Sequence, residues 1–567
     1  MERTGILRRV LPAVSVLLMA SALCVGGAEN AGVPRWTRFE QALESAVDYA
    51  NPPQEASLTV VFTSPQGKAS TVYGFWDGGR TWRVRFAPDQ LGRWTWKTGC
   101  SDAKNGGLHG QSGEFVCIAP AGRSRFAQHG PIRVSSDNRS FVHDDGAPFF
   151  FLADTAWNGA LLSTRDDWET YLRTRAGQGF SAVQFVTTQW RAAPDGDLKK
   201  ELAYTGTERI SIKTAFFQRL DEKVAALNRA GLLAVPVMLW AINGGSNPQV
   251  NPGVSLPEDQ AVLLARYMVA RWGADHVAWI LGGDADYRGA KAERWKRIGR
   301  AVFGDIPHAP VTMHPGGMQW VWQEFADEDW YGFVGYQSGH GDDDNTLRWQ
   351  TDGPPAVDWM RPPHRPFVNL EPCYENHLAY QSRRPIAPEQ VRRAMYWSLL
   401  HTPTAGVAYG GHGVWGWDDG TKPPTDHAGS GIPLPWQRAL TMPGARQMEY
   451  LSRYFTSIDF GRLRPAPEVV VNQPGSQEPR RFIAAARTDR NDLLVLYVPE
   501  DRAVDVKADT LPPSPRASWF DPRTGETSTA VGDTTAGAVR FRTPSEGDWN
   551  LQIISQKQQK GGGAGRR

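Results

Sequence analysis

The segment HVAWILGGDAD, residues 276–286, places a short apolar run directly before Asp284. A second segment of the same form, RPFVNLE at 365–371, ends on Glu371. Continuous apolar runs of this length are typical of strands buried on both faces, as in a parallel sheet. If the two strands belong to one such sheet, both carboxyl groups lie at its carboxyl end, where α/β barrels carry their chemistry.

Six further apolar runs have the same character. They span 148–154, 181–187, 232–240, 309–314, 331–337 and 405–410. Amphipathic segments lie between the runs, and in one of them Phe217, Leu220, Val224 and Leu227 follow helical spacing before Gly231, a residue that commonly ends a helix. Eight strand and helix units predict an α/β fold with a (β/α)8 TIM barrel over residues 131–455. An open, doubly wound sheet is the structural alternative.

The segments on both sides of the predicted barrel have a different pattern. Residues 33–120 and 462–555 contain short runs of β-branched and aromatic residues broken by Gly, Pro and Asp. This pattern predicts an N-terminal and a C-terminal β-sandwich domain. The final residues, 556–567, read QKQQKGGGAGRR and are predicted to form a disordered tail, because they offer almost nothing apolar to bury.

The N-terminus predicts export. Basic residues Arg3, Arg8 and Arg9 precede an apolar run from Val10 to Val25, and small residues follow up to Ala28. This is the layout of a signal peptide over residues 1–28, so we expect a secreted or periplasmic protein. A membrane anchor is the alternative, although the apolar run is shorter than the roughly 20 residues that span a bilayer.

The overall charge is nearly balanced. The 567 residues include 62 Lys plus Arg and 60 Asp plus Glu, a formal net charge of +2. Such a chain has no long-range field toward nucleic acid or an anionic membrane. Residues 411–416 match a dinucleotide-binding pattern, but the WDDGTKPP that follows does not predict a helix. We therefore expect no nucleic-acid partner, no membrane partner after signal removal, and neither a metal nor another cofactor; the oligomeric state stays open.

Three cysteines follow the predicted signal peptide. Cys100 and Cys117 lie in predicted neighbouring strands of an exported domain, which suggests a disulfide bond. Two buried thiols are an equally good interpretation. Cys373 has no basic neighbour in sequence and is interpreted as a packed residue.

Two carboxyl groups at one end of a barrel suggest the hydrolysis of a glycosidic bond. Asp284 follows the fourth strand and Glu371 ends the seventh, roughly across the barrel. Such a pair flanks the bond, with one carboxyl protonated to assist the leaving oxygen and one ionised to attack the sugar. Asp286 and Glu375 are the alternatives for these two roles.

Other side chains at the predicted strand ends are candidates for contacts with a sugar. The predicted substrate-binding residues are Asp154, Trp157, Asn158, Gln189, Trp190, Asn243, His314, Tyr336, Glu375, Tyr409, His412 and Trp415. Arg191, Gln337 and His340 follow the same strand ends and receive no specific role. Aromatic rings can stack on sugars and amides can bond to hydroxyl groups, which makes carbohydrate the expected substrate.

The motifs together resemble a known family. The blocks FLADTAWN, GFSAVQFV, WILGGDAD, NLEPCYE and AYGGHGVWGW resemble the apiosidase-like glycoside hydrolase domains, a (β/α)8 family of bacterial polysaccharide-degrading enzymes. The preceding GFWDGG, VRFAP and GRWTW resemble the small β domain that often comes before that domain. The later WFDPRTGE and DWNLQI resemble the β domain called collagen-binding in such proteins.

The resemblance implies an Asp as acid/base and a Glu as nucleophile, carried onto Asp284 and Glu371. We therefore predict a secreted glycoside hydrolase that cleaves plant or microbial polysaccharide, with retention at the anomeric carbon. The alternative is a non-catalytic carbohydrate-binding or adhesive protein on a barrel scaffold. The sugar, its linkage, exo or endo action and the role of the two β domains are not predicted.

Overall fold

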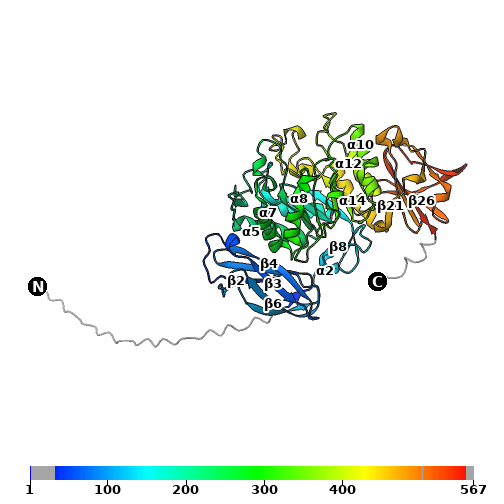
Figure 1. Ribbon diagram of the computed structural model, residues 1–567. Coiled ribbons are helices and arrows are strands. Elements are labelled where there is room, and N and C mark those ends of the chain that lie inside the picture. Colours follow the sequence, from blue (N-terminus) through cyan, green and yellow to red (C-terminus); the bar gives the residue numbers. More distant parts are fainter. Residues whose placement is uncertain (2–31, 501, 557–567) are drawn as a thin grey trace.

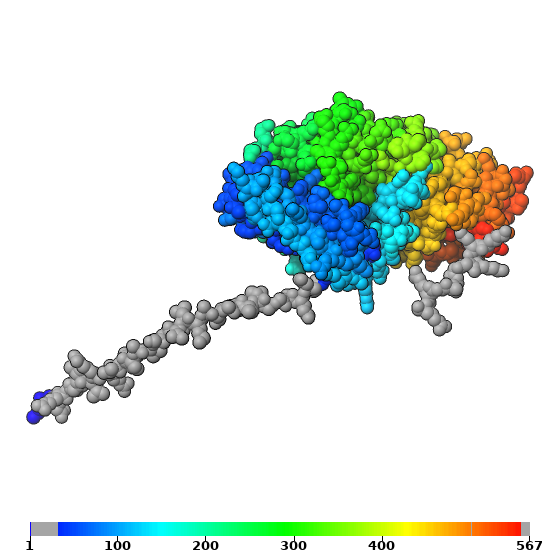
Figure 2. Space-filling view, turned by 60° about the horizontal axis from the view of Figure 1, so that its bottom comes forward, coloured from blue at the N-terminus to red at the C-terminus, as the bar shows by residue number. Residues whose placement is uncertain are grey.

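The computed structural model describes residues 1, 32–500 and 502–556. Residues 2–28 of the predicted signal peptide and all but the first residue of the predicted tail lie outside these ranges. The described chain forms an N-terminal β-rich region, an α/β barrel and a C-terminal β-rich region (Figure 1). The three parts lie side by side, with the N-terminal region in blue against the green barrel and the C-terminal region in orange and red at its far side (Figure 2).

The middle of the chain forms a near-closed barrel of eight parallel strands. In chain order these are β11 (Phe151–Thr155), β12 (Ala182–Val186), β15 (Leu233–Trp240), β16 (Trp279–Gly283), β17 (Val311–Thr312), β18 (Val334–Gln337), β19 (Phe367–Glu371) and β20 (Gly406–Gly410). Their order in the sheet is cyclic, because β20 returns to pair with β11 and each other strand lies beside its neighbours in sequence. A parallel bridge between Val311 and Tyr331 links the two outer strands. The predicted barrel is confirmed, and the open sheet is excluded.

Helices follow the strands and pack around the barrel. The longer ones are α4 (Arg165–Gly177), α5 (Thr214–Arg229), α7 (Glu258–Trp272), α8 (Ala290–Phe303), α10 (Asp344–Asp352), α12 (Pro388–Leu400) and α14 (Pro443–Thr456). The short ones are α3 (Gly159–Leu162), α6 (Pro252–Ser255), α9 (Trp322–Phe325), α11 (Pro354–Asp358) and α13 (Trp436–Ala439). In α5 the predicted apolar face is buried, and Gly231 after it has φ +75°, a conformation that favours glycine at a helix end.

The N-terminal region forms one seven-stranded sheet with its own apolar core. Its strands are β1 (Val33–Pro34), β2 (Phe39–Glu44), β3 (Leu58–Thr63), β4 (Ala69–Gly78), β5 (Thr81–Phe86), β6 (Gly92–Cys100) and β7 (Ser112–Ile118), with the short helix α1 (Pro52–Glu55). Helix α2 (Arg125–His129) and a small antiparallel sheet of β8 (Ile132–Val134), β9 (Phe141–His143) and β10 (Pro148–Phe149) lead into the barrel.

The two N-terminal cysteines are too far apart for the suggested disulfide. Cys117 of β7 pairs with Gly92 of β6, while Cys100 is at the opposite end of β6. The eight residue-to-residue steps from Gly92 to Cys100 span roughly 26 Å in an extended strand. Both thiols are free and buried, as is Cys373, so the alternative of two buried thiols is confirmed.

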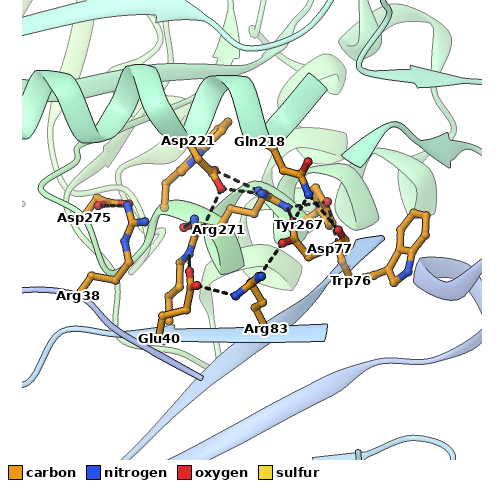
Figure 3. Close-up of polar contacts among 12 residues, drawn as sticks. Arg38, Glu40, Trp76, Asp77, Arg83, Gln218, Asp221, Tyr267, Arg271 and Asp275 are labelled. Carbon is orange, nitrogen blue, oxygen red and sulfur yellow. Dashed lines mark hydrogen bonds and ion pairs between the residues drawn. The ribbon is translucent and has the colours of Figure 1, made fainter. Parts of the chain in front are cut away.

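A buried ion-pair network joins the N-terminal region to the barrel (Figure 3). Arg271 of α7 donates to Asp221 of α5 at 2.6 Å and to Asp77 of β4 at 2.8 Å. Arg85 of β5 also donates to Asp221, at 2.8 Å. The side chain of Arg271 has no exposed surface, so these contacts fix the sheet against helices α5 and α7.

The C-terminal region consists of two sheets around a second apolar core. One contains β21 (Leu463–Pro465), β23 (Ala484–Thr488), β24 (Leu493–Val498), β30 (Trp549–Ser555), β26 (Pro515–Phe520) and β27 (Thr527–Ala530), and the other contains β22 (Val470–Val471), β25 (Ala503–Lys507), β29 (Ala538–Arg542) and β28 (Gly532–Thr535). Arg392 of α12 forms a buried pair with Asp548 at 2.7 Å, which ties this region to the barrel. Among the described residues, no helix combines the length and apolar character needed to cross a bilayer.

Candidate active site

Two glycines at the end of β16, directly before Asp284, leave room for neighbouring aromatic side chains. A Cβ atom on Gly283 would lie 2.6 Å from the Trp240 ring, and one on Gly282 would lie 2.6 Å from the Tyr287 hydroxyl. Only glycine therefore allows both aromatic side chains to pack against this strand end. Asp284 directly follows β16 and lies at the carboxyl end of the sheet.

Asp284 is held by one amide. Gln337 at the end of β18 donates its Nε2 to Asp284 Oδ1 at 3.0 Å and to Pro315 O at 2.8 Å. Burial, followed by the charge of Glu371, raises the pKa of Asp284, and His314, Arg191 and the Gln337 hydrogen bond counteract this only in part. The environment of Asp284 thus favours the protonated carboxyl.

Glu371 ends β19 between two histidines. His340 Nε2 lies 3.0 Å from Glu371 Oε1, and His314 Nε2 lies 3.4 Å from Oε2. Burial acts to raise the pKa of Glu371, but the hydrogen bond and charge of His340, the charge of His314 and the Tyr374 hydroxyl outweigh it and lower this pKa. The environment of Glu371 thus favours the ionised carboxylate.

The two carboxyl groups therefore have opposite preferences at one end of the barrel. The two groups are close enough to interact, since the charge of Glu371 is among the causes of the raised pKa of Asp284. A pair of titratable groups whose pKa values are pushed apart is the usual arrangement of an acid beside a nucleophile or base. The site can donate one proton and present one carboxylate to the same substrate.

An aromatic cluster packs beside the carboxyl pair. The ring of Trp157 lies 5.5 Å from that of Trp240 and 5.4 Å from that of His314. Trp190 lies 4.4 Å from Trp240, and Trp415 lies 4.9 Å from His427. The structure thus brings the predicted residues Trp157, Trp190 and His314 together near Glu371.

Several buried polar atoms around this cluster have no hydrogen-bond partner within the protein. They are His314 Nδ1, Trp240 Nε1, Trp415 Nε1, Gln184 Oε1 and Arg191 Nε. Buried polar groups are nearly always bonded, to protein, to water or to a bound molecule. A hydroxyl-rich molecule would supply both donors and acceptors to such a group of atoms.

Asp154 has a different environment from the one predicted. Its carboxylate accepts from Arg175 Nε and from the Tyr171 hydroxyl of α4, each at 2.7 Å, and both ends of the ion pair are fully buried. The next residue, Thr155, instead accepts from Gln184. We correct the prediction for Asp154 to a structural ion pair between β11 and α4.

Glu375 and Tyr409 are bonded to each other. Glu375 accepts from the Tyr409 hydroxyl at 2.6 Å and from the backbone amides of Gly444 and Ala445 at 2.9 and 3.2 Å. The carboxylate therefore caps the N-terminus of α14, where the helix dipole favours negative charge. We correct both predictions from substrate contact to a structural role.

Asn158 and Gln189 also bond to the protein itself. Asn158 donates to Gly416 O and accepts from Trp190 Nε1, and Gln189 accepts from Ala203 N. His412 bonds to Asn376 O and Ser430 Oγ, each at 3.1 Å. Both polar atoms of Asn158 and of His412 are engaged, so we correct their predicted role from substrate contact to loop support. Gln189 is bonded through Oε1 alone, and its contact with substrate stays a prediction.

Tyr336 points away from the carboxyl pair. Its ring lies 5.9 Å from Trp320 and 6.0 Å from Trp349, outside the barrel. The pairing of β18 with β19 shifts register between Tyr336 and Gln337, and it is Gln337 that contacts Asp284. Asn243 is exposed in the loop after β15.

Asp286 does not compete with Asp284. It pairs with Arg288 at 2.8 Å and with Lys291 at 2.7 Å, and these hydrogen bonds lower its pKa.

The sequence gave no role to Gln337, His340 or Arg191 and did not single out Tyr374 or Trp240. Only their positions could have pointed to these residues. Each follows or ends a barrel strand, except Tyr374, which comes three residues after Glu371.

Two other observations bear on the site. A groove of about 800 Å³ runs between the N-terminal sheet and α7, but its carboxyl groups Glu258 and Asp259 are bonded to Arg297 and Gln260, so we do not place the chemistry there. Within the described part of the chain, no three His, Cys, Asp or Glu side chains gather in a way that would hold a metal ion.

Three protein-family models match consecutive parts of the chain. Residues 135–461 match the model described as "Apiosidase-like, catalytic domain". Residues 32–101 match a domain of unknown function, and residues 465–554 match the "Putative collagen-binding domain of a collagenase". Comparison with curated protein sequences gives no match.

Solved structures of similar fold are glycoside hydrolases. A family 5 glycoside hydrolase from Bacteroides vulgatus ATCC 8482 is 20% identical, with a TM-score of 0.66 over 77% of this chain and 96% of that one. A "putative glycoside hydrolase" from the same organism is 18% identical, with a TM-score of 0.68 over 92% and 99% of the two chains. At these identities the likeness concerns the fold.

Proposed function

Because the chain belongs to the apiosidase-like family, we propose that it hydrolyses glycosidic bonds in plant or microbial polysaccharide, with retention at the anomeric carbon. Asp284 is the acid/base and Glu371 is the nucleophile. The observation that carries this assignment is the opposite direction of the two pKa shifts, raised for Asp284 and lowered for Glu371, at one end of the barrel.

The reaction proceeds in two displacements. Glu371 attacks the anomeric carbon while Asp284 gives its proton to the leaving oxygen, so one C–O bond forms as another breaks. Asp284, now a carboxylate, then takes a proton from water as that water attacks the anomeric carbon and releases Glu371. His340 and His314 hold the carboxylate of Glu371 ionised for the first step.

Reducing-sugar release from pectic, arabinan, xylan and marine polysaccharides tests the activity. Glu371→Gln and Asp284→Asn are each expected to lower turnover at least about 100-fold, because each removes a group that acts in the transition state. Asp286→Asn is the matched control, since this carboxyl is two residues away and already paired with Arg288 and Lys291. Near-normal turnover in either site variant would remove that residue from its role.

Two further measurements separate the alternatives. The anomer released first, followed by NMR, reports retention or inversion directly. Binding of a glycan without release of reducing sugar would favour the non-catalytic alternative, a carbohydrate-binding protein on a barrel scaffold.

The rest of the chain fits a secreted enzyme of three domains. We infer that the two β-rich regions are sandwich domains. In the C-terminal region two sheets share one core, and in the N-terminal region strands near opposite ends of the single sheet, β7 and β2, contribute Cys117 and Leu43 to one core. Export remains a proposal that rests on the sequence of residues 1–28, and N-terminal sequencing of the mature protein after expression in a bacterial host tests it.

A further inference from the structure

One aromatic side chain near the carboxyl pair is open to solvent. Tyr380 lies in the loop between β19 and α12, nine residues after Glu371, and 56% of its surface is exposed. The tryptophans of the site are instead buried, among them Trp157, Trp190 and Trp240. An exposed aromatic ring beside the site is available for contact with a bound molecule.

The loop holds Tyr380 in place. Leu378 and Pro385 form an antiparallel bridge, and Ala379 N donates to Arg384 O at 2.9 Å, so the segment is a tight hairpin with Tyr380 at its tip. Tyr380 N donates to His340 O at 3.0 Å. The neighbouring Ser382 N donates to Asp342 Oδ1 at 3.2 Å, and Asp342 N donates to Gln381 Oε1 at 3.1 Å.

These bonds fix the hairpin to the loop after β18, which also carries His340. The ring of Tyr380 is 5.5 Å from that of His340 at an interplanar angle of 82°, and 5.9 Å from that of His377 at 77°. Neither histidine stacks face to face on the tyrosine. The ring is thus held in place but not covered. Because it is already ordered, it would lose little conformational entropy when a ligand binds.

The contacts with His340 place Tyr380 close to the carboxyl pair, because His340 Nε2 itself lies 3.0 Å from Glu371 Oε1. Burial raises the pKa of the Tyr380 hydroxyl, and the charges of Glu371 and Asp284 raise it further while Arg191 acts against them. Tyr380 therefore lies beside the carboxyl pair through its contact with His340, and 56% of its surface is open to solvent.

We propose that Tyr380 is a substrate-binding residue that stacks its ring on a neutral sugar unit bound next to the Asp284 and Glu371 pair. The apolar faces of pyranose and furanose rings suit a flat aromatic surface, and an exposed, fixed ring provides one. The inference rests on the proposed function and adds a specific contact to it.

Kinetics on the polysaccharide that the wild type cleaves in the screen test the proposal. Tyr380→Ala is expected to raise KM about tenfold with kcat changed less than about threefold, because stacking contributes to substrate and transition state alike. Tyr380→Phe and Tyr380→Trp keep the ring and are expected to stay within about threefold of wild type in KM. In the Glu371→Gln background, calorimetry with oligosaccharides of the same polysaccharide is expected to give a Kd about tenfold weaker for Tyr380→Ala.

Met360→Ala is the matched control. Met360 is 57% exposed, like Tyr380, but it precedes β19 at the amino end of the barrel. A Tyr380→Ala protein with wild-type KM and Kd overturns the proposal for Tyr380 and leaves the hydrolase intact. A KM raised equally in Tyr380→Phe also overturns it, because the hydroxyl and not the ring would then be responsible. A wild type that cleaves no polysaccharide of the screen rejects the proposed function, and the inference with it.

Discussion

His340 Nε2 lies 3.0 Å from Glu371 Oε1, while the Nδ1 atom of the same ring accepts the backbone N–H of Tyr374 at 3.3 Å. A backbone N–H can only donate, so in the neutral ring Nδ1 carries no proton and Nε2 carries it. His340 therefore donates to Glu371 even when it is uncharged.

Removing that donor is expected to weaken Glu371 as a nucleophile. His340→Ala takes away a hydrogen bond to a charged group, worth about 1.5–3 kcal/mol, so turnover should fall about 10- to 100-fold. The pKa of Glu371 should also rise, which moves the acidic limb of the pH–rate profile toward higher pH. His340→Gln keeps an N–H donor and should recover part of the rate. An unchanged acidic limb in His340→Ala would contradict the role of His340.

The directions of the two pKa shifts predict a bell-shaped pH dependence of kcat/KM. The rate should rise as pH increases through the lowered pKa of Glu371, because the nucleophile must be ionised. It should fall as pH increases through the raised pKa of Asp284, because the acid must be protonated.

Asp284→Asn with an aryl glycoside whose leaving group needs no proton is the matched test of the second limb. The alkaline fall should be absent in this variant, although overall activity is low. A wild-type rate that keeps rising into alkaline pH would contradict the assignment of Asp284 as the acid.

The sequence was sufficient for the barrel because apolar runs and their spacing repeat along the chain. Each of the eight expected runs overlaps a barrel strand, and the ends of β16 and β19 are Gly283 and Glu371. The direction of individual side chains was harder to predict. In β18 the pairing with β19 shifts register between Tyr336 and Gln337, and Gln337 is the residue that contacts Asp284. No sequence pattern predicts this shift.

Long-range partners were the second obstacle. Glu375 is bonded to the amides of Gly444 and Ala445, about seventy positions further along the chain, and Asp154 is paired with Arg175 on a helix outside the barrel. All four are acidic residues at or shortly after the carboxyl end of a barrel strand. Only the tertiary contacts distinguish a carboxyl that supports the fold from one that faces substrate.

Glu375 is predicted to matter for stability and not for chemistry. Glu375→Gln removes a carboxylate that accepts from Tyr409 and two helix amides, so the free energy of unfolding should fall by about 1–3 kcal/mol. Gly444→Ala should have a similar effect, because its Cβ would lie 2.5 Å from Glu375 Oε2. Thermal unfolding and initial rates below the transition separate the two properties.

Glu371→Gln is the contrasting variant. It should lose turnover while its melting temperature stays close to that of the wild type. A Glu375→Gln protein with wild-type melting temperature and no turnover would instead make Glu375 part of the chemistry.

The interface network predicts that the N-terminal region stabilises the barrel. Arg271→Met keeps the length of the side chain but leaves Asp221 and Asp77 without their shared cation (Figure 3). Breaking a buried ion pair from one side typically costs about 3–5 kcal/mol, so a large fall in melting temperature is expected. Arg93→Met, which breaks an exposed pair with Glu114 in the N-terminal sheet, should change the melting temperature much less.

The same network should make stability sensitive to acid. Burial acts to raise the pKa of Asp221, but the charges and hydrogen bonds of Arg271 and Arg85 outweigh it and lower this pKa. A carboxyl with a depressed pKa in the folded state adds stability above its unfolded pKa of about 3.9, and this contribution is lost as pH falls through the folded value. Asp221→Asn cannot titrate, so its deficit against the wild type should be full at neutral pH and shrink below about pH 4. Denaturant midpoints of both proteins from acid to neutral pH measure this, and a deficit that stays constant down to the lowest pH would contradict an ionised Asp221 in the network.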